Sequence, residues 1–97
     1  MSLTEYLKQN GFETKVYEHQ DGKPTFVTKV FDISEVPRFH QHVAYDECIT
    51  HVTLEYDECG DVLQWCDCCG DFEGITTEDL DQVNSMLAIF NLKYEEE

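Results

Sequence analysis

The chain has 97 residues, of which 41% are hydrophobic, and its formal net charge is −15. This length supports one small domain with a modest core, and the apolar content distinguishes the chain from an acidic disordered tail. So acidic a surface argues against nucleic acid or anionic lipid as a direct partner, because like charges repel. We therefore expect a single acidic domain over residues 1–97 whose natural partner is a basic surface.

Targeting signals and cysteine usage indicate the compartment. The first residues lack a basic segment followed by an apolar one, and no apolar run approaches membrane-spanning length, so we expect a protein that is soluble and not exported. Five cysteines are an odd number and a poor disulfide framework. Reduced thiols in a cytoplasm fit this pattern better.

The first elements in the chain are a helix and a hairpin. Ser2 and Glu5 have the spacing of a capping box, and the short helix that follows should end at Gly11. Residues 12–19 and 25–31 are rich in Val, Phe, Tyr and Thr, with turn residues at 20–23 between them. These two segments predict a first β-hairpin.

A second helix and a second hairpin are expected next. Ser34 can cap a helix in which Val36, Phe39, His40 and Val43 fall at helical spacing. Residues 49–56 alternate cleanly, with Val52, Leu54 and Tyr56 on one face, and residues 57–61 turn the chain so that 62–68 run back.

The last expected element is a helix that follows a loop over residues 70–75. Either Thr76 or Thr77 can cap it, and its apolar side is formed by Leu80, Val83, Met86, Leu87 and Phe90. The resulting fold class is α+β: an antiparallel four-stranded sheet made of two hairpins, with two to three helices packed on one face.

The cysteines suggest two kinds of chemistry. Trp65, Cys66 and Cys69 have the W-C-x-x-C spacing of a redox motif, but no helix follows the motif, and the acidic surroundings should raise a thiol pKa. Cys59, Cys66, Cys68 and Cys69, with Cys48 or His51 nearby, could supply zinc ligands, although they lack paired C-x2-C knuckles. Half-buried strand cysteines are the simpler interpretation of both patterns.

Sequence patterns for other kinds of functional site are weaker still. His40 and His42 would diverge on a helix, and the segment 67–78 has Phe72 where a calcium loop needs glycine. No phosphate loop, nucleophile elbow or HExxH motif occurs. We expect a protein that is not an enzyme and has no metal or cofactor.

The acidic residues are unevenly distributed. Residues 39–92 contain twelve acidic side chains and no Lys or Arg, whereas residues 1–38 are nearly neutral. A surface tuned only for solubility would mix charges of both signs, and the lack of cations costs stability by self-repulsion. A rigid array of carboxylates could imitate the phosphates that DNA-binding grooves recognise. The candidate partner-binding residues, which could form a continuous band, are Glu55, Asp57, Glu58, Asp61, Asp67, Asp71, Glu73, Glu78, Asp79 and Asp81.

The whole chain, from its opening residues 1–12 (MSLTEYLKQNGF) through its size and charge, resembles the small phage and prophage anti-CRISPR proteins, in particular one directed at the type I-F surveillance complex. The resemblance implies a monomeric DNA mimic that acts in the cytoplasm of a bacterial host. It would bind subunits of the complex at their basic DNA-binding surface and block target DNA. The resemblance assigns no residue a role.

Two alternatives remain open from the sequence. One is a small zinc-stabilised or thiol-bearing interaction module. The other is an acidic, antitoxin-like inhibitor of a different basic nucleic-acid-binding protein, which shares the charge argument of the DNA mimic.

Overall fold

A computed structural model describes residues 2–16, 25–39 and 49–95. Its elements are α1 (Leu3–Gln9), β1 (Glu13–Val16), β2 (Thr25–Asp32), the 3-10 helix η1 (Ile33–Glu35), β3 (His51–Asp57), β4 (Val62–Asp67), β5 (Phe72–Thr76) and α3 (Leu80–Ile89). The five strands form one antiparallel sheet in the order β1-β2-β3-β4-β5. The α+β class is therefore confirmed.

The sheet has five strands rather than the predicted four. Residues 70–75 were expected to form a loop, but Phe72–Thr76 pairs with β4 along its whole length. This strand was not predicted because four of its five residues are exposed, so it shows no apolar alternation, and Gly74 lies at its centre.

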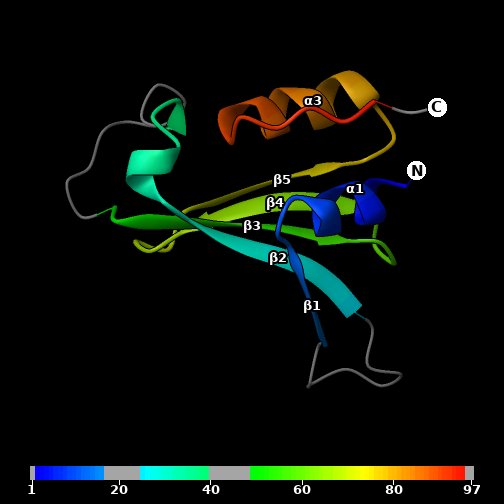
Figure 1. The fold of residues 1–97 in the computed structure, drawn as a ribbon, viewed down its shortest axis with the longest axis horizontal. Helices are drawn as coiled ribbons and strands as arrows, with labels where there is room; N and C mark the ends of the chain where they lie inside the picture. Colours follow the sequence, from blue (N-terminus) through cyan, green and yellow to red (C-terminus); the bar gives the residue numbers. More distant parts are fainter. Residues whose placement is uncertain (1, 17–24, 40–48, 96–97) are drawn as a thin grey trace.

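The helices α1 and α3 pack on the same face of the sheet (Figure 1). The buried side chains form one cluster between these layers, and Val52, Leu54 and Tyr56 of β3 lie in it as predicted. α3 contributes Val83, Met86 and Leu87, followed by Phe90 just after the helix. Leu80 was expected on the same apolar side but is 37% exposed, because it begins the helix at the edge of the core.

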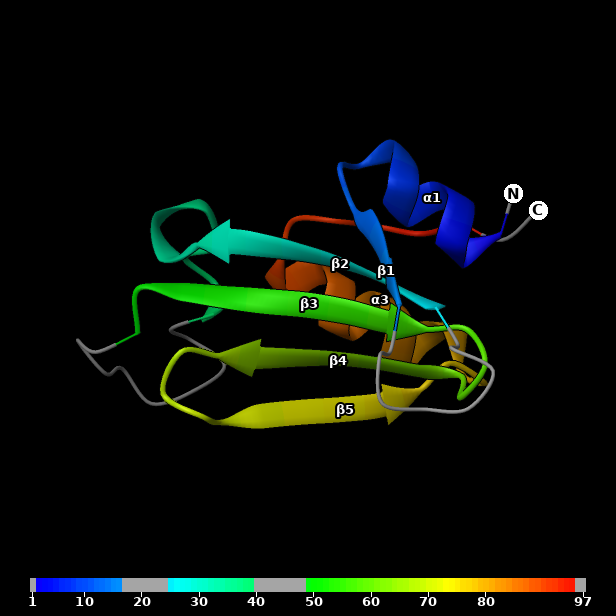
Figure 2. The same cartoon turned by 90° about the horizontal axis from the view of Figure 1, so that it is seen from below.

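The other face of the sheet is not covered by α1 or α3 (Figure 2). The side chains of Thr53 and Glu55 alternate with the buried residues of β3 and belong to this face, as do Gln64 and Cys66 of β4. We call this surface the open face. The row Val30, Thr53, Cys66 and Phe72 crosses it, one residue from each of four strands.

The helix ends show which caps the sequence identified correctly. The Ser2 hydroxyl accepts the Glu5 N–H at 3.2 Å, and Gly11 follows α1 with φ of +92°, so both predicted limits of this helix are confirmed. α3 is instead capped by Asp79, whose carboxylate accepts the Asp81 N–H at 2.9 Å. Thr76 is not a cap because it ends β5, and the Thr77 N–H bonds to the Asp61 carbonyl.

In its described part, the predicted second helix begins as the 3-10 helix η1, a turn follows, and Phe39 at the end of the described range is helical. Asp32 caps it and accepts from the Ser34 N–H at 3.0 Å, so Ser34 is not the cap. The remainder of that prediction, including His40 and Val43, lies outside the described residues, as do the first hairpin's turn at 20–23 and the histidine pair. Of the helices that are described, none has the length and apolar character needed to cross a membrane.

Candidate partner-binding site

The β3–β4 turn and the connection from β5 to α3 lie at the same end of the sheet, on the right in Figure 1. The Thr77 N–H joins them by donating to the Asp61 carbonyl at 2.9 Å. Since both segments are acidic, the antiparallel topology gathers carboxylates that are distant in sequence. We call this group the acidic end; its members are Glu55, Asp57, Glu58, Asp61, Glu78, Asp79 and Asp81.

On the open face, the acidic end includes a hollow of about 430 Å³ between β3 and β4. Glu55 and Asp57 line one side of it, and Val62 and Gln64 line the other. A Cβ at Gly74 of β5 would lie only 3.3 Å from the Gln64 Cβ, so β5 approaches this residue closely. Two carboxylates beside an aliphatic wall suit the head and stem of a lysine or arginine side chain.

On the helix face, a second hollow of about 490 Å³ lies at the acidic end. Leu3, Tyr56, Tyr94 and Glu78 are among the residues that line it. Burial raises the pKa of the Tyr56 hydroxyl, the Thr77 side chain lowers it by hydrogen bonding, and the charges of Glu58 and Asp61 raise it further.

The seven carboxylates of the acidic end form no ion pair with the described residues. Among the described residues, Lys93 forms an ion pair with Glu95 at 3.4 Å. Lys8 of α1 and Glu58 line one further hollow, and Glu58 accepts a hydrogen bond from the Thr4 hydroxyl at 3.4 Å. Among residues 2–16, 25–39 and 49–95, the negative charge of the acidic end is therefore largely uncompensated, as a surface that receives external cations requires.

Two members of the acidic end also hold the backbone. One oxygen of Asp57 accepts the N–H groups of Cys59 and Gly60, at 3.0 and 3.1 Å, and thereby closes the β3–β4 turn. Asp79 caps α3 through its Oδ1 atom. These two carboxylates are consequently held in place, which preorganises the charge that a partner would meet.

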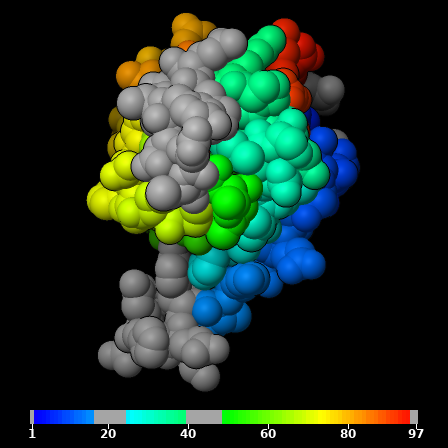
Figure 3. All heavy atoms as spheres, turned by 90° about the vertical axis from the view of Figure 1, so that its left-hand side faces the viewer, coloured from blue at the N-terminus to red at the C-terminus, as the bar shows by residue number. Residues whose placement is uncertain are grey.

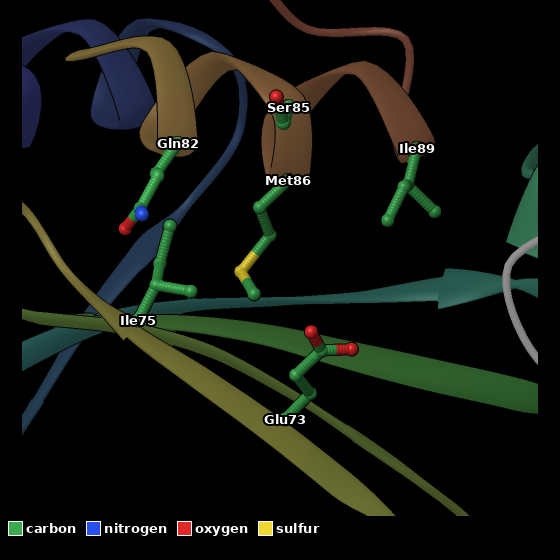
Figure 4. A pocket seen from close by; sticks show the side chains of 6 residues that line it. All are labelled: Glu73, Ile75, Gln82, Ser85, Met86 and Ile89. Atoms are coloured by element: carbon green, nitrogen blue, oxygen red, sulfur yellow. The ribbon is translucent and has the colours of Figure 1, made fainter. Parts of the chain in front are cut away.

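The other three candidate acids lie away from the acidic end. Asp67 and Asp71 belong to the β4–β5 turn at the opposite end, which faces the viewer in Figure 3. Asp67 is only 9% exposed, and its Oδ1 atom accepts the N–H groups of Cys69 and Asp71. Glu73 lies on the helix face of β5 beside α3 (Figure 4). The continuous band expected from the sequence is thus divided, with seven acids together and three apart.

Sequence reasoning did not identify the apolar walls of the acidic end. Tyr56 was expected to be a core residue, and its alternation with Leu54 gives no sign that its hydroxyl borders a charged surface. Tyr94 lies in the tail after α3, where it packs on Tyr6 with ring centroids 5.6 Å apart. No periodic signal marks such a tail residue, so only the folded chain places it beside Tyr56.

The predicted zinc ligands are divided between the two ends of the sheet. Cys59 lies in the β3–β4 turn, whereas Cys68 and Cys69 follow β4, a strand of six residues. A strand of that length spans about 20 Å, too far for one metal ion to be shared. In residues 2–16, 25–39 and 49–95, no group of three or more His, Cys, Asp or Glu side chains could hold a metal; Cys48 lies outside these ranges.

Cys66, the first cysteine of the W-C-x-x-C motif, and Cys68, which lies within the motif, have opposite surroundings. Burial raises the pKa of the Cys66 thiol, and the charges of Glu55 and Asp67 add to the effect, as the acidic sequence predicted. The N–H groups of His51 and Thr50 instead lower the pKa of Cys68, whose Sγ lies 3.3 Å from the Thr50 nitrogen. The leading cysteine of the motif therefore lacks the activated thiol of a redox site.

Protein-family models, curated proteins and solved structures were each compared with the chain, and none of them gave a match.

Proposed function

We propose that this protein is a non-enzymatic inhibitor that binds the basic DNA-binding surface of another protein in place of DNA. The observation that carries the proposal is the acidic end, where seven carboxylates from two separate segments form no ion pair with the described residues. Duplex DNA presents about one negative charge per 1.7 Å of its axis, and the grooves that hold it carry matching Lys and Arg side chains. A dense, rigid carboxylate surface fits the same grooves.

Rigidity distinguishes this surface from an acidic tail. The acidic residues stand on β3, on the β3–β4 turn and at the start of α3, and two of them, Asp57 and Asp79, also accept backbone N–H groups. A partner therefore need not order a flexible chain when it binds, and less of the interaction free energy is lost to entropy.

The target that we propose is the surveillance complex of a type I-F CRISPR system, which the resemblance of the sequence to anti-CRISPR proteins implies. The site of action would be the cytoplasm of the bacterial host. A different basic nucleic-acid-binding protein, as in the antitoxin-like alternative, would use the same acidic end and the same charge complementarity.

Competition with DNA tests this proposal. Purified type I-F surveillance complex is mixed with a labelled target duplex at low salt, and the protein is added in increasing amounts. We expect the duplex to be displaced and the protein to bind the complex directly, with both effects weakening steeply as salt increases. Direct binding that leaves the duplex in place would contradict the competitive mechanism, and an absence of binding would exclude this target.

A further inference from the structure

The outer edge of β5 is a free sheet edge among the described residues. The order β1-β2-β3-β4-β5 gives β5 only one neighbour, β4. Phe72 is 71% exposed, and Gly74 and Thr76 are also exposed. An edge of this kind presents backbone groups that another extended segment can pair with.

The register identifies which backbone groups face outward. In an antiparallel ladder, hydrogen-bonded and non-hydrogen-bonded pairs alternate. The Asp67 N–H donates to the Asp71 carbonyl and the Thr77 N–H donates to the Asp61 carbonyl, each at 2.9 Å. Between these two bonded pairs, every second pair is hydrogen-bonded, so the backbone groups of Glu73 and Ile75 point toward β4. The groups of Phe72, Gly74 and Thr76 consequently point outward.

A hollow beside this edge has the shape that a sixth strand would fill. It lies between β5 and α3 and is lined by Glu73, Ile75, Gln82, Ser85, Met86 and Ile89. Figure 4 shows Met86 and Ile89 extending from α3 toward β5, whose Ile75 and Glu73 side chains face the same space. Every second side chain of an added strand would enter this space, because successive side chains of a strand alternate between the two faces. Aliphatic side chains suit its walls.

The charge around β5 selects among the possible occupants. Asp71 precedes the strand, and Glu78 and Asp79 follow it, so a segment paired with the edge lies between acidic groups. A second copy of this chain would bring another net charge of −15 to the same place and would be repelled. At the sheet's other edge, β1 carries both Glu13 and Lys15, so its charges offset each other and it lacks the acidic surroundings of β5.

We infer that the free edge of β5 binds an extended segment of the basic target, in which lysine or arginine side chains alternate with aliphatic ones, by adding it as a sixth strand. The inference rests on the proposed function for its basic partner, and it adds a mode of recognition to that function. Main-chain hydrogen bonds would supply affinity, and the hollow beside α3 would select the aliphatic residues.

Hydrogen exchange measured by NMR tests the inference without the target itself. The probe is a capped synthetic peptide in which lysine and valine alternate, added to the full-length, isotope-labelled protein. A control peptide has the same lysines but proline in place of valine, so it carries equal charge but lacks every second backbone N–H and holds φ at about −65° at those positions, which disfavours an extended strand. We expect the valine peptide to bind about tenfold more tightly and to slow exchange selectively at the amides of Phe72, Gly74 and Thr76.

Equal affinity of the two peptides, or unchanged exchange at those three amides in the bound protein, would overturn the inference. Slowed exchange at the same amides in the free protein at high concentration would identify a second copy as the occupant and would also overturn it. These outcomes are separate from displacement of DNA by the acidic end, which can succeed whether or not β5 pairs with a peptide.

A pair of variants gives a second readout. Thr76→Pro removes one outward N–H at an edge position where proline is tolerated, while Thr76→Ala removes only the side chain. We expect the proline variant to lose about tenfold in affinity for the valine peptide and the alanine variant to lose less than about twofold. Equal losses would exclude backbone pairing at this position.

Discussion

At the scale of single residues, several acids of this chain stabilise its turns. Asp67 is the clearest example, because its Oδ1 atom accepts two N–H groups of the β4–β5 turn while the side chain stays 9% exposed. Its neighbour Asp71 is exposed and provides a comparison in the same turn. A net charge therefore overstates the number of carboxylates that a partner can reach.

Asp67→Ala should lower the free energy of unfolding by about 1–2 kcal/mol, because two turn N–H groups lose their acceptor. Asp71→Ala, which removes an equal charge from the same turn, should change it by less than about 0.5 kcal/mol. Urea denaturation measures both. Equal destabilisation by the two variants would show that the hydrogen bonds of Asp67 contribute nothing specific.

The cysteines should differ in reactivity. The pKa of Cys68 is lowered by the His51 and Thr50 N–H groups, so its reactive thiolate form should appear at lower pH than usual. The pKa of Cys66 is raised by burial, so its thiolate should appear later. Alkylation at neutral pH, mapped by mass spectrometry, should modify Cys68 before Cys66. It should also modify Cys68 before Cys59, which is exposed as well and therefore controls for accessibility. Preferential modification of Cys66 would contradict these directions.

At the scale of elements, α3 depends on a cap that also belongs to the acidic end. Asp79→Ala should lower the free energy of unfolding by about 1 kcal/mol because the Asp81 N–H loses its acceptor. Asp79→Ser removes the same charge but keeps an oxygen that can cap, so it should be nearly neutral. Thermal unfolding of both variants separates capping from charge, and a serine variant as unstable as the alanine variant would refute the capping role.

The elements also show how far the sequence predicts this fold. Strong patterns, such as the alternation of Val52, Leu54 and Tyr56 and the spacing of Val83, Met86 and Leu87, identified β3 and α3. β5 could not be predicted in this way, because an exposed edge strand buries too little to leave a periodic signal. Its existence is determined by pairing with β4, which is a tertiary effect.

The candidate site was predictable in composition but not in arrangement. The absence of cations from residues 39–92 identified the acidic region. Which acids meet depends on strand direction, since Asp61 and Thr77 are joined across the sheet while Asp67 lies at its other end. The sequence contains the charges, and the antiparallel topology determines their neighbours.

At the scale of the whole molecule, the net charge of −15 should make salt act in opposite ways on folding and on binding. Screening reduces repulsion within the fold, so the melting temperature should rise as sodium chloride increases from about 0.01 M to 0.15 M, where the Debye length falls from about 30 Å to about 8 Å. Circular dichroism at each salt concentration measures this. A melting temperature that falls over the same range would show that self-repulsion is not a significant cost.

The most direct test of the acidic end compares two double variants that change the net charge equally. Glu58→Lys with Glu78→Lys alters the acidic end, whereas Glu13→Lys with Glu35→Lys alters exposed positions on β1 and η1. The affinity of each for purified type I-F surveillance complex is measured at low and at high salt. The first pair should weaken binding by about tenfold or more and reduce its salt dependence, and the second by less than about twofold. Equal weakening by both pairs would contradict the assignment of partner binding to the acidic end.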